Sequence, residues 1–116
     1  MRYLFILNDP PYGTERSYNA LRLADKVIKT DESAEVSVFL MADAVGCAKA
    51  GQQTPNGFYN LESMLKPILR KGEVLLCGTC MDARGISDGE LLEGAHRSTM
   101  DELANTTVEA DKVLIF

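Results

Sequence analysis

The fold prediction starts from residues 73–86, which read Glu-Val-Leu-Leu-Cys-Gly-Thr-Cys-Met-Asp-Ala-Arg-Gly-Ile. The apolar run from Val74 to Leu76 is typical of a short buried strand. Gly78 and Thr79 suit a tight turn that leads into a helix. The stretch therefore predicts a strand, a turn and a helix, with Cys77 at the junction.

Cys77 is the residue for which the sequence argues most directly for chemistry. A side chain at a helix start lies near unpaired backbone N–H groups and the positive end of the helix dipole, and both favour thiolate over thiol. Arg84, seven residues further on, adds a permanent positive charge about two helical turns away. Because the thiolate is the nucleophilic form of cysteine, we predict a reactive Cys77 with a depressed pKa.

Strands and helices alternate along the rest of the chain. Further strands are expected at 3–7, 34–41 and 113–116, each an apolar or partly alternating run. Capping residues and 3.6-residue periodicity predict the helices. The first helix runs from Thr14 to about Lys29, and the second from Asp43 to Ala50. The third begins at Asn60 and has a kink or break at Pro67, and the fourth begins at Ser87 (capping box with Glu90). The last begins at Thr99, and its apolar face consists of Met100, Leu103, Ala104 and Val108.

This alternation predicts the fold class and the place of the site. It is typical of a single three-layer α/β/α domain over residues 1–116, with a mainly parallel sheet of about four to five strands. Sites in such sheets form outside the carboxyl ends of the strands. Asn8 and Asp9, Asp43, and Cys77 follow three of the predicted strands. We expect them to share one pocket with three further candidates, Gly78, Thr79 and Arg84.

Composition and charge exclude several function classes. Hydrophobic residues make up 46% of the chain and charged residues 25%, as in ordinary globular proteins. The formal net charge of -5 argues against nucleic-acid and anionic-membrane binding. No segment approaches transmembrane length and no signal peptide is recognisable, so we expect a cytoplasmic protein.

The cysteine and histidine pattern gives no support for a metal or a disulfide framework. There are three cysteines, at positions 47, 77 and 80, and one histidine, His96. A structural zinc site needs four ligands, and an odd cysteine count argues against paired disulfides. No glycine-rich nucleotide motif is present. We therefore predict neither a metal nor a cofactor.

Each candidate residue also has an ordinary structural interpretation. Cys77 could be a small buried hydrophobe at a strand end. Cys80 could be a resolving thiol or a packing residue. Cys47 is expected in the core, Asp43 could serve only as a helix cap, and His96 is expected at the surface or at a cap.

Three stretches together resemble one protein family. They are Leu-Asn-Asp-Pro-Pro-Tyr-Gly-Thr-Glu-Arg at 7–16, Val-Phe-Leu-Met-Ala-Asp-Ala-Val at 38–45, and Cys-Gly-Thr-Cys-Met-Asp-Ala-Arg-Gly at 77–85. In order and spacing they resemble the DsrE/DsrF-like family, which includes YchN-like and TusD-like proteins. The resemblance spans nearly the whole chain. It implies an α/β/α domain that assembles into homo- or hetero-oligomers, commonly trimers or hexamers.

The resemblance also implies sulfur chemistry. Family members with assigned roles are sulfur-relay subunits that take a persulfide sulfur on one cysteine and pass it to a partner protein. Their acceptor cysteine precedes an Arg-Gly pair whose glycine lies eight residues on, and Cys77 and Gly85 have that spacing. Cys80 departs from the pattern, because a second thiol can resolve a persulfide into a disulfide.

Three function hypotheses follow. The protein is a persulfide carrier using Cys77, a C-x-x-C thiol–disulfide redox protein using Cys77 and Cys80, or a non-catalytic oligomeric binding protein. In each case we expect a homotrimer or homohexamer, and the loop aromatics Tyr12, Phe58 and Tyr59 could be lid or interface residues. A sulfur donor or acceptor protein is the further partner that the first hypothesis requires.

Overall fold

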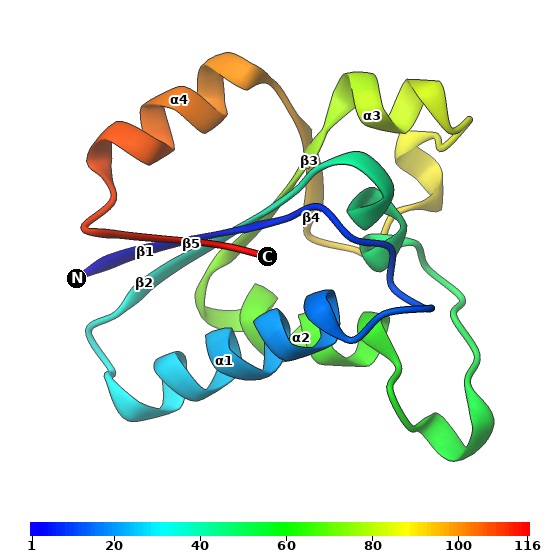
Figure 1. The fold of residues 1–116 in the computed structure, drawn as a ribbon, viewed down its shortest axis with the longest axis horizontal. Helices are drawn as coiled ribbons and strands as arrows, with labels where there is room; N and C mark the ends of the chain where they lie inside the picture. Colours follow the sequence, from blue (N-terminus) through cyan, green and yellow to red (C-terminus); the bar gives the residue numbers. More distant parts are fainter.

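Five parallel strands form one sheet in the computed structural model, which describes residues 1–116 (Figure 1). The strand order is β4-β3-β2-β1-β5, so β1 lies inside the sheet, and β4 and β5 are the two edges. The strands are β1 (Arg2–Leu7), β2 (Glu35–Leu40), β3 (Glu73–Cys77), β4 (Ala95–Ser98) and β5 (Lys112–Ile115).

Helices cover both faces of this sheet. Figure 1 shows α1 and α2 together on one face, and α3 and α4 on the other. The predicted α/β/α class with a parallel sheet is therefore confirmed. The α-helices are α1 (Arg16–Thr30), α2 (Leu61–Lys71), α3 (Gly78–Ala83) and α4 (Met100–Glu109), and the 3-10 helices are η1 (Ala42–Ala48), η2 (Pro55–Gly57) and η3 (Asp88–Glu90).

The two faces of the sheet are packed very unequally. Alternate strand residues such as Phe5, Val38 and Leu76 point to α1 and α2 and belong to a core of 20 buried residues. The other face contributes a cluster of only five buried residues, Leu4, Phe39, Leu75, Cys77 and Leu103. Successive side chains of a strand point to opposite faces, so the one-residue offset places Cys77 on the thinly covered face.

The sequence predicted two of the helix caps correctly. The Asn60 side chain accepts from the backbone N–H of Ser63 at 3.0 Å, and Thr99 accepts from Glu102 N–H at 3.2 Å. Each bond satisfies one of the unpaired donors at a helix start. These caps fix where α2 and α4 begin.

Other predicted helix boundaries were wrong. Helix α1 begins at Arg16 behind Glu15 and not at Thr14, whose hydroxyl instead donates to Asp9 at 3.2 Å. The segment after β2 is 3-10 helix behind Met41, so Asp43 is not its cap. Ser87 does precede a helix, but η3 is a single 3-10 turn with no side-chain cap.

The structure differs from the expectations in three further places. Helix α2 runs through Pro67 as one helix and not as two short pieces. Strand β4, in which His96 is exposed, was not predicted at all, because Ala-His-Arg-Ser contains no apolar run. In α4 only Leu103 is buried, whereas Met100 and Val108 are exposed. No helix of the structure has the length and apolar character that crossing a membrane requires.

Candidate functional site

Cys77 is both the last residue of β3 and the N-cap of α3. The predicted turn between strand and helix does not exist, because Gly78 is already the first helical residue. Gly78 is needed there for space: a Cβ atom at this position would lie 3.1 Å from the Ser98 carbonyl oxygen and from Arg97 Cγ. The direct junction holds the thiol at the carboxyl edge of the sheet.

Hydrogen bonds lower the pKa of the Cys77 thiol. Burial by itself would raise it, and the residue is 7% exposed. The Cys80 and Thr79 side chains and the backbone N–H groups of the same two residues outweigh that effect. The Cys77 Sγ atom lies 3.2 Å from Thr79 Oγ1. The donors favour the thiolate because they bind the charged form better than the neutral one.

Cys80 has the opposite character. Its contact with the Cys77 thiol is the largest cause that raises its pKa, and burial adds to it. The backbone of Ala42 and the charge of Arg84 lower the pKa of Cys80 without reversing that result. Of the two thiols, Cys77 therefore loses its proton first, and Cys80 keeps its proton and can donate it toward the Cys77 sulfur.

Arg84 does not act on Cys77 as the sequence suggested. Helix α3 ends at Ala83, so Arg84 lies at its C-terminal end and turns toward η1. Its Nε atom donates to Asp43 Oδ1 at 2.7 Å, and its Nη1 atom donates to the Cys80 carbonyl at 3.1 Å. Arg84 therefore fixes α3 to η1, and its positive charge lowers the pKa of Cys80.

Cys47 lies in the core, as the sequence predicted. It is fully buried in η1, and burial raises the pKa of its thiol to about 12, against a smaller opposing effect of the Ser17 hydroxyl. A thiol with this pKa is almost entirely protonated at neutral pH. The three free cysteines thus divide into one activated thiol, one neighbouring donor and one inert core residue.

A cleft of about 430 Å³ lies directly over Cys77. One wall is the start of α3, and the other is the end of β4 with the start of α4. The strand register pairs Cys77 with Ser98, which brings these two walls together. The lining residues are Cys77, Gly78, Thr79, Asp82, Arg97, Ser98, Thr99 and Met100.

Arg97 locks the two walls of this cleft to each other. Its Nη1 atom donates to the Gly78 carbonyl at 3.1 Å, and its Nε and Nη2 atoms pair with Asp88 at 2.8 Å and Asp82 at 3.0 Å. The hydrogen bonds to Asp88 and then Asp82 raise the pKa of Arg97 further. Ser98, which is buried, donates its hydroxyl proton to the Glu102 carboxylate.

The structure separates the other predicted pocket residues from this cleft. The Asn8 side chain donates to the Phe116 carbonyl at 3.2 Å, and Asp9 pairs with Arg16 at 3.7 Å, both beside β1 and two strands from β3. Asp43 follows the adjacent strand but is engaged by Arg84. Of the pocket candidates, Gly78 and Thr79 line the cleft with Cys77, and Asn8, Asp9, Asp43 and Arg84 do not.

The second wall was missed because its residues give no sequence signal. Arg97 and Ser98 sit on the unpredicted strand β4, and Thr99 and Met100 follow it directly. The capping box of Thr99 and Glu102 was recognised, but a cap signal indicates a helix start and not what the helix faces. Only the parallel pairing of β3 with β4 places this segment against Cys77.

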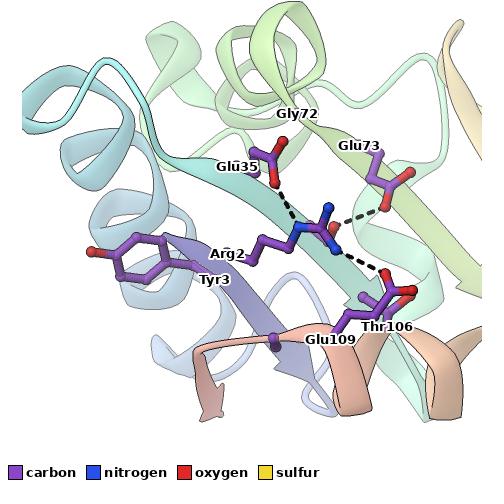
Figure 2. Close-up of a pocket in the computed structure, with 9 residues that line it drawn as sticks. Arg2, Tyr3, Glu35, Gly72, Glu73, Thr106 and Glu109 are labelled. Carbon is purple, nitrogen blue, oxygen red and sulfur yellow. Dashed lines mark hydrogen bonds and ion pairs between the residues drawn. The ribbon is translucent and has the colours of Figure 1, made fainter.

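A second cleft, of about 370 Å³, lies at the amino ends of β1, β2 and β3 (Figure 2). There Arg2 pairs with Glu35 at 2.7 Å and Glu109 at 3.1 Å, while Ser37 donates to Glu73 at 2.8 Å. Its polar side chains thus bond one another, and it contains no cysteine. Nowhere do three His, Cys, Asp or Glu side chains come together as a metal site would require.

Known proteins are similar to this chain both in sequence and in fold. The chain is 40% identical to protein YchN of Escherichia coli K12 over 116 residues, which cover 99% of this chain and 98% of that protein. It is 38% identical to an uncharacterized protein of Methanocaldococcus jannaschii over the whole length of both.

Solved structures agree with the sequence relatives. The crystal structure of YchN from Escherichia coli superposes with a TM-score of 0.95 at 38% identity, over 100% of this chain and 99% of the other. A protein of unknown function from Methanobacterium thermoautotrophicum shares the fold with a TM-score of 0.80 at 14% identity. The family model described as DsrE/DsrF-like matches residues 1–116. The chain therefore belongs to the DsrE/DsrF-like family.

Proposed function

We propose that the protein is an intracellular sulfur-relay subunit that carries a persulfide on Cys77. The observation that supports this most is the Cys77 thiol itself, whose pKa is lowered by neighbouring donors while it lines a cleft of about 430 Å³. Membership of the DsrE/DsrF-like family supports a sulfur-relay type of role. A reducing compartment such as the cytoplasm would keep both thiols available.

Loading of Cys77 is a single displacement. The Cys77 thiolate attacks the outer sulfur of a donor persulfide R–S–SH, a new S–S bond forms to Cys77, and the donor's S–S bond breaks. The donor leaves as R–S⁻, so charge and atoms balance without an external oxidant or reductant. The same displacement in reverse, with an acceptor thiolate attacking the outer sulfur, unloads the protein.

The groups around Cys77 suit this carrier role. A terminal persulfide sulfur carries negative charge and is stabilised by hydrogen-bond donors. The Thr79 hydroxyl and the Cys80 thiol both contact the Cys77 sulfur and can donate toward the sulfur atom added to it. The cleft supplies the volume that an added sulfur atom and the end of a donor group require.

A thiol–disulfide redox role is the second candidate, and the Cys77–Cys80 contact favours it. A thiolate beside a protonated thiol is also the arrangement that forms a disulfide by expelling a group bound to the first sulfur. In a carrier this reaction would release the bound sulfur as hydrosulfide. The two functions therefore differ in whether Cys80 donates a hydrogen bond or attacks.

The test is the intact mass of the protein after incubation with a cysteine desulfurase and cysteine. We expect a gain of one sulfur atom, about 32 Da, on wild type and on Cys80→Ser, and none on Cys77→Ser. Cys47→Ala is the matched control, because it removes a cysteine that is buried and protonated. It should load as the wild type does.

Other patterns of mass would contradict the proposal. Loss of two hydrogens in wild type, with no sulfur adduct even in Cys80→Ser, would identify the redox function. No change in any variant would leave a binding protein without thiol chemistry. Equal loading of Cys77→Ser would place the sulfur on another cysteine.

We further propose that the protein acts as a homotrimer or homohexamer that meets separate donor or acceptor proteins. The face of the sheet carrying α4 supports an oligomer because it leaves apolar side chains in water. Val108 is 86% exposed and Ile115 is 67% exposed. The predicted interface aromatics Phe58 and Tyr59 lie instead against α1 and α2: Phe58 is 68% exposed, and the centroid of the Tyr59 ring lies 4.5 Å from that of Tyr18.

A further inference from the structure

The charges around the Cys77 cleft decide which sulfur donors can approach it. Arg97 is the sole Lys or Arg residue that lines the cleft, and it is already shared between Asp82 and Asp88. Its positive charge is thus more than balanced before any substrate arrives. An anionic donor would have to compete with two carboxylates for one guanidinium.

The α4 wall adds two carboxylates with no balancing cation. Asp101 and Glu102 stand in the first turn of α4, directly after the lining residues Thr99 and Met100. Neither residue takes part in any of the eight ion pairs of the structure. Neither residue lines the cleft itself, but the start of α4 thus places two unbalanced carboxylates directly beside its wall.

Ser98 extends this acidic character into the cleft. Its side chain is buried in the cleft wall beside Cys77 and gives its proton to Glu102. The proton is therefore engaged, and the hydroxyl oxygen presents lone pairs to the cleft. Such an oxygen attracts N–H, S–H and ammonium groups and repels carboxylate, sulfonate or thiosulfate oxygens.

We propose that the Cys77 cleft selects sulfur carried next to a positive charge, with Asp82, Glu102 and Asp101 as the specificity-determining residues. The ligand class is a thiol, persulfide or disulfide with an ammonium or guanidinium group near the sulfur. Anionic sulfur compounds are selected against. This inference rests on the proposed use of Cys77 as a nucleophile, but not on whether Cys77 carries sulfur or forms a disulfide.

Three small disulfides of different charge test the selection. The probes are cystamine, bis(2-hydroxyethyl) disulfide and dithiodiglycolate, which are cationic, neutral and anionic. The Cys77 thiolate attacks one sulfur, a mixed disulfide forms on Cys77, and the other half leaves as a thiolate. The protein is the full chain with Cys80→Ser, so that no second thiol resolves the product, which is followed by intact mass.

Each rate constant is divided by that of a blocked, neutral cysteine with the same probe, which removes the intrinsic reactivity of the disulfide. We expect the normalised rate for cystamine to exceed that for dithiodiglycolate by roughly tenfold at low ionic strength, and the ratio to fall as salt screens the carboxylates in and beside the cleft. A ratio of one or below, or one that does not depend on salt, would overturn the inference.

A matched pair of variants separates the cleft's charges from the net charge of the chain. Glu102→Gln removes one carboxylate and keeps an oxygen that can accept from Ser98. Glu32→Gln makes the same change in the turn between α1 and β2, at the amino ends of the strands and away from the Cys77 cleft. We expect Glu102→Gln to lower the charge ratio by about twofold to threefold and Glu32→Gln to leave it unchanged.

Two further arms complete the test. Asp101→Asn, which disturbs no side-chain bond, should lower the ratio even if Glu102→Gln proves unstable. Equal effects of the Glu102 and Glu32 variants would overturn the inference. Disulfides of Lys-Cys-Lys and Glu-Cys-Glu peptides test whether the charge preference extends to a polypeptide donor. Faster reaction with the Lys peptide than with the Glu peptide would identify a polypeptide as the donor. A charge preference seen only with cystamine would identify a small cationic thiol.

The result is independent of the sulfur-loading experiment. A charge preference together with no sulfur loading would mean that the cleft serves thiol–disulfide exchange. Sulfur loading together with a ratio of one would refute the charge selection alone.

Discussion

At the scale of single residues, the reactivity of Cys77 depends on two side chains within the same helical turn. The Thr79 hydroxyl lies 3.2 Å from the Cys77 sulfur, and the Cys80 thiol makes the other contact that lowers its pKa against burial. The backbone N–H groups at the helix start would by themselves offset less of the rise in the Cys77 pKa that burial causes. The site is thus activated by specific donors, and not only by the start of a helix.

We expect removal of either donor to raise the pKa of Cys77. The alkylation rate of Cys77 against pH should show a midpoint below the ordinary value of about 8.5 in wild type, because the lowered pKa populates thiolate at lower pH. In Thr79→Val and Cys80→Ala the midpoint should move upward. Cys80→Ser is the control, since serine restores a donor at the same position; identical midpoints for Cys80→Ala and Cys80→Ser would show that donation by Cys80 plays no part.

The sequence correctly placed Cys77 between a strand and a helix but wrongly placed Arg84 beside it. Cys77 could be placed because an apolar run of strand length ends at it and a helix start follows. Arg84 was misassigned because a seven-residue spacing means two helical turns only if the helix lasts that long, and α3 ends at Ala83. The partner of Arg84 is Asp43, which is 41 residues away in sequence.

At the scale of elements, the start of α4 positions one wall of the cleft. Thr99 caps this helix by accepting from the Glu102 N–H group at 3.2 Å, and the carboxylate of the same Glu102 accepts from the Ser98 hydroxyl. The remaining support is small, because Leu103 is the one residue of α4 that is buried. A helix held by a single buried side chain depends strongly on its cap.

We expect Thr99→Ala to lower the free energy of unfolding by about 1 kcal/mol, the usual effect of removing an N-cap side chain. Urea denaturation followed by circular dichroism measures it. Thr106→Ala is the matched control: its hydroxyl donates to the Glu102 carbonyl within the same helix, where alanine has the higher helix propensity. Equal losses in the two variants would mean that the Thr99 cap contributes nothing specific.

Apolar runs predicted four of the five strands, including the edge strand β5, and failed only for β4. Strands β1, β2 and β3 are interior and carry continuous or alternating apolar residues, so their runs were recognisable. Strand β4 is an edge with one buried residue, Ser98, and therefore leaves no apolar pattern. The apolar positions of α4 correctly predicted a helix but wrongly predicted a buried apolar face, because α4 covers only part of the sheet beneath it.

At the scale of the whole molecule, the unequal packing of the two sheet faces is the main feature. One face is closed by α1, α2 and η1, and the other leaves parts of β5 and α4 open. Val113 is exposed on β5, and Ile115 and Val108 are more so. Exposed apolar side chains on an edge strand favour association with another chain.

We expect light scattering at micromolar concentration to give a mass several times the chain mass of 12.7 kDa. Val108→Lys and Ile115→Lys should each reduce that mass, because a charge would be buried in the interface. Leu23→Lys on α1 is the control, since Leu23 is an exposed leucine on the well-packed side. Dissociation caused by the Leu23 variant alone would move the interface to the other face, and a monomeric wild type would refute the oligomer.

The pairing of β3 with β4 also has a consequence for the newly made chain on the ribosome. Cys77 and the donors beside it are complete once α3 has been synthesised, but Arg97, Ser98 and Thr99 follow some twenty residues later. The nucleophile therefore exists before the wall that encloses it. A nascent or truncated chain that stops before residue 97 lacks the wall formed by β4 and α4, and it leaves Asp82 and Asp88 without the Arg97 guanidinium that pairs with them in the finished protein.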